Sequence, residues 1–358
     1  MKVKDFPFDD FLMIKAERDK KLEDFILRGK GKIAVVQRPP SFYTRAICRY
    51  KELQLESELE FLYQSAICKS DFMFSFLEPW VGVGVYAAAF GCPFLRSEVD
   101  APQTHPIAFS TEDLKNLKTP DIKRCEPMQE VLKRIRFFKD KTGSLLDISL
   151  TDTQSPNDTA SLIMDTCEFF MAALSEPEEL VPFLQSVTDL IEKFTLIQME
   201  EIGDNLVLPG HSMLSSRKFK GIALSDDNMA VVSPSVYEVI GIPFNNQLSR
   251  RFGGLSLHSC GDFHQNYKLV QKHEGLILLD CAIGKSQDPN PNDVERLKAT
   301  FKDKNVILKV RLGKEDDLQI LEMLIDSGLR LIVQFSAENV QEGNLLYESI
   351  HTLIDSNR

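Results

Sequence analysis

Residues 255–312 decide the fold class, and they read LSLHSCGDFHQNYKLVQKHEGLILLDCAIGKSQDPNPNDVERLKATFKDKNVILKVRL. This stretch contains three short apolar runs, at Leu255–Leu257, Leu276–Leu279 and Val306–Val310. Two patterns typical of helices separate them, at Phe263–Lys272 and Pro291–Phe301. Such alternation predicts parallel strands that are joined by right-handed helical crossovers.

The same rhythm continues on both sides of this stretch. Further apolar runs lie at Leu145–Leu150, Gly221–Leu224 and Leu329–Val333. Further helical patterns cover Thr159–Leu174, Pro177–Glu201, Pro234–Phe252, Glu315–Ser327 and Glu342–Asp355. At least six strand-and-helix units favour a closed barrel over an open doubly wound sheet. No Gly-x-Gly-x-x-Gly turn follows an early strand, which weakens the dinucleotide-binding alternative. We therefore predict an α/β fold, a (β/α)8 TIM-like barrel, with its chemistry at the carboxyl ends of the strands.

The first third of the chain gives weaker signals. Charged helical segments are predicted at Lys15–Arg28 and Lys51–Lys69, and the polar passage Ser97–Pro127 is predicted to be loop. We predict a single domain over residues 1–358, in which residues 1–75 form an N-terminal helical segment that packs on the barrel.

Charge and cysteine content exclude several classes of protein. The net charge of −11 argues against a nucleic-acid partner and against an anionic membrane surface. No apolar run approaches the ~18 residues of a spanning helix, and Met1–Asp10 has mixed charge where a signal peptide needs an apolar core. The seven cysteines are scattered, which is typical of a reducing compartment. We expect a cytoplasmic protein whose thiols are free for metal binding or chemistry.

The string His258-Ser259-Cys260-Gly261 carries the strongest chemical signal. Residues two apart on a strand point to the same side, so His258 and Cys260 can face one point in the barrel mouth. An imidazole and a thiolate make half of a zinc site, and a catalytic zinc needs a third protein ligand. Cys281 at the end of the next strand is one candidate and Glu338 is another. A buried cysteine beside a hydrogen-bonded histidine is the structural alternative.

A second group is Ser225-Asp226-Asp227-Asn228, directly after an apolar run. Two carboxylates at a strand end, Asp226 and Asp227, can position substrate or exchange protons. A solvated acidic loop explains the same pattern. Downstream, Ser233 precedes Pro234 in the order of an N-cap and the first helical residue, and a helix N-terminus at the mouth also suits an anion.

A third group is the basic pair Arg45 and Arg49, which is interleaved with aromatic residues. On a helix the two arginines would share a face and could bind carboxylates or phosphates. Surface arginines without a ligand are the structural alternative.

Together these segments resemble the uroporphyrinogen decarboxylase superfamily. Pro40–Tyr50 is similar to the N-terminal Pro-x-Trp-x-x-Arg-Gln-Ala-Gly-Arg-Tyr motif of that family, with Arg45, Arg49 and Tyr50 on matching positions. Ser225–Pro243 is similar to the family's fifth-unit pattern. Gly253–Gly261 resembles the zinc motif of the methylcobamide:thiol methyltransferases, a branch of the same superfamily.

The chain also departs from both branches. Where the decarboxylases carry a catalytic Asp in a Phe-Ser-Asp-Ile-Leu stretch, this chain has Phe74-Ser75-Phe76-Leu77-Glu78. Ser155–Thr159 corresponds to a segment that their active-site Tyr accompanies, and no Tyr follows here; Val333–Ser336 replaces the region of their late histidine. The methyltransferases take a third zinc ligand, a Cys, from the last strand, where this chain has Gln334–Ala337.

The resemblance implies a methyltransferase that moves a methyl group between a corrinoid and a small acceptor or donor. It implies Zn²⁺ on His258 and Cys260. Our candidate for the third ligand is Cys281, and Glu338 is the alternative. Asp226 and Asp227 are then the candidate catalytic residues. The candidate substrate-binding residues are Arg45, Arg49, Asn228 and Ser233.

The same resemblance suggests the partners. A corrinoid protein or a free cobamide is the expected partner, because no Asp-x-His-x-x-Gly corrinoid-binding segment occurs in the chain. A homodimer is compatible with this interpretation. The alternatives are a decarboxylase that acts on a tetrapyrrole and a non-catalytic ligand-binding barrel.

Overall fold

The computed structural model describes residues 1–40, 49–97, 101–118, 120–313, 318–325 and 327–357. Six parallel strands form one sheet in the order β1-β10-β9-β8-β7-β6. In chain order these strands are β1 (Ile33–Arg38), β6 (Ile222–Ser225), β7 (Leu255–His258), β8 (Leu276–Ala282), β9 (Ile307–Leu312) and β10 (Arg330–Ser336). A separate parallel pair consists of β2 (Phe76–Leu77) and β5 (Asp147–Ile148).

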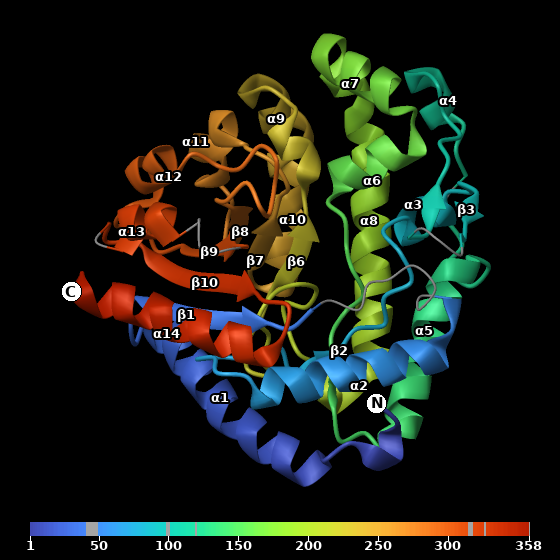
Figure 1. The fold of residues 1–358 in the computed structure, drawn as a ribbon. Coiled ribbons are helices and arrows are strands. Elements are labelled where there is room, and N and C mark those ends of the chain that lie inside the picture. The colour runs from blue at the N-terminus through green and yellow to red at the C-terminus, as the bar shows by residue number, and fades with distance from the viewer. Residues whose placement is uncertain (41–48, 98–100, 119, 314–317, 326, 358) are drawn as a thin grey trace.

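Backbone contacts join the pair to both edges of the larger sheet. Beside β6, Gln154 forms a parallel bridge with Ser225. Beside β1, the amide of Asp71 donates to the carbonyl of Val35 over 2.9 Å. Within the described residues the eight parallel strands therefore close into the predicted TIM-like barrel, which confirms the fold class (Figure 1).

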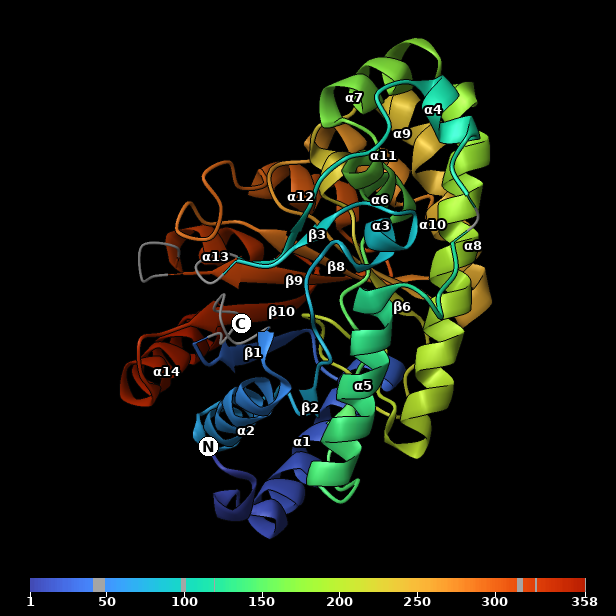
Figure 2. The same cartoon turned by 90° about the vertical axis from the view of Figure 1, so that its right-hand side faces the viewer.

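Helices cover the outside of the strands (Figures 1 and 2). The α-helices are α1 (Phe8–Arg28), α2 (Lys51–Ile67), α3 (Val85–Ala89), α4 (Thr111–Lys115), α5 (Glu126–Lys141), α6 (Pro156–Ile163), α7 (Thr166–Ser175), α8 (Pro177–Ile202), α9 (Pro234–Ile240), α10 (Ile242–Phe252), α11 (Tyr267–Val270), α12 (Val294–Phe301), α13 (Leu318–Ile325) and α14 (Val340–Ser356). A short antiparallel pair, β3 (Phe94–Leu95) and β4 (Gln103–Thr104), lies in the excursion between β2 and β5. None of the described helices has both the length and the apolar character to span a bilayer.

The interior of the barrel is apolar at one end and polar at the other. Leu278, Ile307 and Ile332 belong to one buried cluster near the amino ends of their strands, and Phe25 of α1 packs into the same cluster. Two residues further along each strand come Asp280, Lys309 and Gln334, all buried. Because residues two apart on a strand share a face, these polar side chains point into the upper part of the barrel. The fold thus concentrates charge below the mouth.

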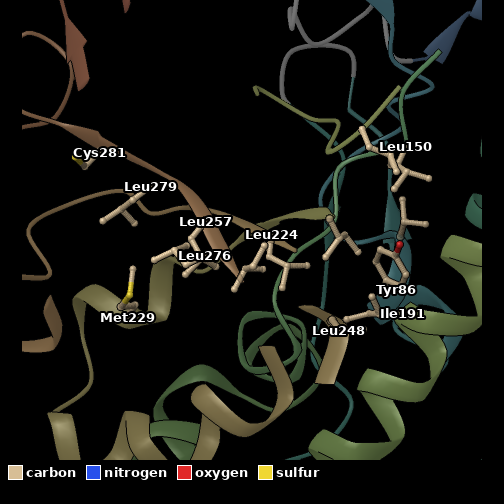
Figure 3. Close-up of a cluster of buried hydrophobic side chains, with 14 of the residues drawn as sticks. Tyr86, Leu150, Ile191, Leu224, Met229, Leu248, Leu257, Leu276, Leu279 and Cys281 are labelled. Carbon is tan, nitrogen blue, oxygen red and sulfur yellow. The ribbon is translucent and has the colours of Figure 1, made fainter. Parts of the chain in front are cut away.

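The outer face of the same strands forms the main hydrophobic core with the helices. Leu224, Leu257 and Leu279 lie in this core together with Leu248 of α10 (Figure 3). These residues alternate with the inward-facing ones, as the pleat of a strand requires. Along each strand, therefore, every second side chain points into the barrel, and only these side chains can reach the barrel mouth.

The segment 1–75 contains both predicted helices, and it also contributes a strand to the barrel. Strand β1 lies within it and pairs with β10 along its whole length. The description of residues 1–75 as a helical segment is corrected in this respect. The passage Ser97–Pro127, which was predicted to be loop, contains β4 and α4, and α5 begins at its end, so this prediction is also corrected.

Candidate metal centre and active site

Three side chains that could hold a metal ion converge at the ends of β6 and β7. His258 is the last residue of β7, Cys260 follows two residues later, and Asp227 begins a 3-10 turn, η4 (Asp227–Ala230), after β6. One ligand atom from each lies within 4.8 Å of the others. The Nε2 atom of His258 is 3.4 Å from Cys260 Sγ and 3.9 Å from Asp227 Oδ1. We call Asp227, His258 and Cys260 the metal triad.

Asp280 fixes the orientation of the His258 ring. The two residues are direct partners in the β7–β8 register, and His258 Nδ1 is hydrogen-bonded to Asp280 Oδ2. Burial alone would raise the pKa of Asp280, but Lys309, Arg311 and His258 hold it well below its ordinary value. An ionised carboxylate on Nδ1 keeps the proton there and presents Nε2 as the ligand atom, the usual arrangement behind a metal-binding histidine.

A buried carboxylate holds the turn that carries Asp227. Asp158 at the start of α6 accepts the backbone N–H groups of Asp227 and Asn228 over 2.6 and 2.9 Å. Asp227 Oδ1 in turn accepts the N–H of Cys260 over 2.7 Å. Since these three N–H groups have acceptors, the Asp227 carboxylate is held next to His258 and Cys260.

The surroundings of Cys260 disfavour the thiolate form of its side chain. Burial and the neighbouring carboxylate of Asp227 raise its pKa to about 12. A divalent cation among the three donors would reverse this preference, because a coordinated thiol loses its proton.

A cavity of about 380 Å³ opens in the barrel mouth beside the metal triad. Its lining includes Arg38, Trp80, Asp152, His211, Arg311 and Gln334. Arg311 connects the cavity with the metal triad, because its Nε atom is 3.4 Å from Asp280 Oδ2 and its pKa is raised in part by Cys260. We call this space the mouth cavity.

A histidine between two carboxylates lines the mouth cavity. His211 Nδ1 is 2.7 Å from Glu78 Oε1, and His211 Nε2 is 3.6 Å from Asp152 Oδ1. Burial would lower the pKa of His211, but Asp152 and Glu78 raise it to about 9. The imidazole is therefore protonated at neutral pH. His211 was not predicted from the sequence, since it lies in a loop before β6 and not at a strand end.

Comparison with known proteins identifies the family. The family model described as uroporphyrinogen decarboxylase (URO-D) matches residues 80–280, more than half of the chain. The chain belongs to the URO-D family. Among solved structures, this URO-D chain is similar to a methyltransferase from Methanosarcina mazei, with 14% sequence identity and a TM-score of 0.66 over 94% of this chain and 98% of that one. At this identity the likeness shows a shared fold. No curated protein matches the sequence.

In this URO-D barrel Cys281 is not part of the metal triad, which corrects the predicted third ligand. Asp280 points into the barrel, so Cys281 points outward and is fully buried in the core between strands and helices (Figure 3). Asp227 stands beside His258 and Cys260 in its place. Glu338, the other candidate, lines a separate groove of about 640 Å³ with Glu56 and Glu60.

Asp226 also lies away from the mouth, although it was predicted to line it. Its carboxylate is completely buried and accepts hydrogen bonds of 2.7 Å from Asn157, Tyr237 and Asn245. Burial raises the pKa of Asp226, although the hydrogen bonds from these donors act to lower it. Asp226 therefore ties β6 to the surrounding helices, and Asp227 is the acidic residue that faces His258 and Cys260.

The predicted substrate-binding residues are dispersed. Arg45 lies outside the described residues. Arg49 is exposed, and its guanidinium lies 5.7 Å from the centre of the Tyr50 ring. Ser233 precedes α9, as predicted, but its side chain makes no capping hydrogen bond. Asn228 donates to Ser161 Oγ over 3.0 Å and so helps to hold the η4 turn.

Proposed function

We propose that this protein is a zinc-dependent methyltransferase of the URO-D superfamily that moves a methyl group between a corrinoid and a small molecule. The observation that carries the proposal is the metal triad at the strand ends, with the imidazole of His258 backed by Asp280. In a barrel of this type, residues at the carboxyl ends of the strands are the ones that perform chemistry.

The donor set of the metal triad suits zinc. Zinc takes sulfur, nitrogen and oxygen ligands in tetrahedral geometry, and with bonds of about 2.0–2.3 Å its ligand atoms lie about 3.3–3.8 Å apart. The separations of His258 Nε2 from Cys260 Sγ, 3.4 Å, and from Asp227 Oδ1, 3.9 Å, are close to this range. Three protein ligands leave one position for substrate, as in catalytic zinc sites.

The groups around the metal triad have separate roles in this proposal. Asp280 orients His258, while Asp158 holds the turn that presents Asp227. When bound, zinc would act as a Lewis acid that favours the thiolate form of a thiol substrate or polarises a leaving atom. Arg311 joins the metal triad to the mouth cavity, whose volume of about 380 Å³ suits a small ligand. A corrinoid protein or a free cobamide would supply the corrinoid.

A decarboxylase function has less support from the structure. The position that resembles the catalytic Asp of the decarboxylases is Phe76, whose ring belongs to the apolar cluster in the lower barrel. A phenyl ring cannot hydrogen-bond a tetrapyrrole nitrogen or stabilise a cation by its charge. Glu78, two residues later, is engaged with His211.

Methyl transfer in both directions tests the proposal. Zinc-reconstituted protein would be assayed for transfer from methylcobalamin to a small thiol and from small methyl donors to reduced cobalamin, both followed by the visible absorbance of the corrinoid. We expect activity in the wild type, a loss of more than about 100-fold in Asp227→Ala, and normal activity in Glu338→Ala. Absence of methyl transfer in either direction by the zinc-loaded wild type would overturn the proposal.

A further inference from the structure

Two of the three donors of the metal triad are accessible to solvent. The side chain of Asp227 is 47% exposed, whereas that of His258 is 17% exposed. Cys260 is also exposed, in the loop that follows β7. A molecule in solution can therefore reach Asp227 and Cys260 while the barrel stays folded, and only the imidazole is recessed.

The protein itself fixes the positions of these donors. Asp158 accepts the N–H groups of Asp227 and Asn228 over 2.6 and 2.9 Å, and Asp280 holds the His258 ring through Nδ1. In structural zinc sites, by contrast, metal binding supplies the free energy of folding. Because the turn and the ring are held by hydrogen bonds within the protein, the metal triad should lose and regain a metal ion without unfolding.

The Asp227 carboxylate also has a hydrogen-bond donor of its own in the protein. Its Oδ1 atom accepts the N–H of Cys260 over 2.7 Å and lies 3.9 Å from His258 Nε2. Release of a metal ion would therefore leave this oxygen with a donor and would avoid the cost of an unsatisfied acceptor. The carboxylate can thus part from a metal ion at little expense to the fold.

The three donors differ in how strongly they bind zinc. Thiolate and imidazole suit zinc well, whereas carboxylate oxygens suit harder cations such as Mg²⁺ and Ca²⁺. The bond to Asp227 would therefore be the weakest of the three, and a competing ligand can reach it. Asp227 also lies on η4 after β6, apart from the other two donors, so its displacement leaves His258 and Cys260 in place.

We propose that the metal triad exchanges its zinc with the surrounding solution, that Asp227 is the ligand displaced first, and that free zinc thereby regulates the enzyme. This inference rests on the proposed function and adds the regulation of the same site. A ligand from solution forms its bond to zinc as the bond to the Asp227 oxygen breaks. His258 then parts from zinc at Nε2, and Cys260 takes a proton from solvent as its bond to zinc breaks. The exchange involves no oxidation or reduction.

Transfer of zinc to a chromophoric chelator measures the exchange. Zinc-loaded wild type, Asp227→Cys and Asp227→Asn would be mixed with pyridylazoresorcinol, and the absorbance of its zinc complex would be followed with time. We expect the wild type to release its zinc within minutes, although it retains zinc in buffer without a chelator. Even changes behind a zinc ligand alter metal affinity by about 10–100-fold, so a sulfur at position 227 should slow the release at least about 10-fold and a neutral amide should accelerate it by a similar factor.

A matched control and a measurement of folding complete the experiment. Asp262→Asn removes a carboxylate close to Cys260 but outside the metal triad, and it should release zinc at the wild-type rate. The chelator-treated wild type should keep its circular dichroism spectrum and recover one zinc per chain when zinc is added back. Equal release rates in the wild type, Asp227→Cys and Asp227→Asn, or unfolding of the wild type on removal of zinc, would overturn the inference.

The two proposals fail in different ways. Methyl transfer by a wild type whose zinc resists the chelator would overturn the exchange and leave the proposed function intact. Zinc release in the expected order of the variants, without methyl transfer in either direction, would overturn the proposed function and support the exchangeable site. If both proposals hold, the rate of methyl transfer in zinc buffers should rise in parallel with the measured zinc occupancy.

Discussion

Asp280 is the residue on which the geometry of the metal triad depends. It is buried, faces His258 across β7 and β8, and receives the charges of Lys309 and Arg311 at 3.0 and 3.4 Å. Its carboxylate orients the imidazole, and the two cations keep that carboxylate ionised. A carboxylate that hydrogen-bonds the second ring nitrogen of a metal-binding histidine contributes strongly to metal affinity.

Replacement of Asp280 by Asn should therefore weaken zinc binding. An amide holds the His258 ring less firmly and carries no charge, so we expect the zinc dissociation constant to rise by about 10–100-fold. Competition with a chromophoric chelator measures this change. Asp303→Asn, in an exposed turn, is the control for a neutralised aspartate. Unchanged zinc affinity in Asp280→Asn would contradict the role assigned to Asp280.

The metal triad could be predicted from sequence only in part. His258 and Cys260 follow from their spacing and from the family motif. The third residue depends on a register irregularity in the β7–β8 ladder, where Leu255 pairs with Leu276 but Ser256 pairs with Leu278. Without this shift Cys260 and Cys281 would be in register and on one face. Sequence periodicity does not reveal a single-residue shift, and such a shift exchanges the two faces of a strand.

At the scale of elements, the strands that form regular βα units were predictable. The apolar runs between Leu145 and Val333 all coincide with strands β5 to β10. Strand β2 has two residues and gives no periodic signal. Strand β1 is a clear apolar run, Ile33–Val36, but it stands alone between charged helices, and a lone run carries less weight than a repeated one.

The sequence of helix α5 has a helical pattern of apolar residues, but the many charged residues around them obscure this pattern. Its buried residues recur at helical spacing on one face, although the segment is rich in lysine and arginine. The predicted helix Thr159–Leu174 is divided by Asp165, whose side chain caps α7 by accepting the N–H groups of Cys167 and Glu168. A cap of this kind can be read from sequence only when the end of the preceding helix is known.

The start of β6 requires a glycine at position 221. Its φ is +104°, and a Cβ atom there would lie 2.9 Å from the backbone carbonyl atoms of Gly254. Gly221→Ala should lower the free energy of unfolding by at least about 2 kcal/mol, because strain and a backbone clash act together. Gly143, with φ +59° and no atom within 4 Å of the corresponding Cβ, is the matched control for strain alone. Denaturant unfolding of both alanine variants measures the difference, and equal losses would contradict the close approach.

At the scale of the whole molecule, the barrel separates stability from chemistry. Helix α1 packs Leu22 and Phe25 into the apolar cluster of the lower barrel, and the charged side chains gather under the mouth. The long helix α8 runs beside α5 and α10 on the outside (Figure 2). The charged groups at the mouth are thus held by a rigid, apolar frame, and their ionisation is linked to the stability of the whole fold.

His211 should make this linkage measurable. Because its pKa is raised to about 9 in the folded protein, its contribution to stability is fully present below the unfolded pKa of ~6.5 and is lost as the pH rises through about 9. The facing groups are Glu78, Asp152 and Arg38. We expect the difference in unfolding free energy between the wild type and His211→Gln to decrease by about 1–3 kcal/mol from pH 6.5 to pH 10 in urea titrations. A difference that does not change with pH would show that His211 is neutral in the folded state.

The zinc content of three proteins tests the central claim most directly. Wild type, Asp227→Ala and Cys281→Ser would be purified, reconstituted with zinc, passed over a desalting column and analysed for bound metal. We predict one zinc per chain in the wild type and in Cys281→Ser, and a loss of bound zinc in Asp227→Ala, because Asp227 and not Cys281 stands beside His258 and Cys260. A zinc-free wild type, or zinc that is lost in Cys281→Ser but retained in Asp227→Ala, would contradict the metal triad.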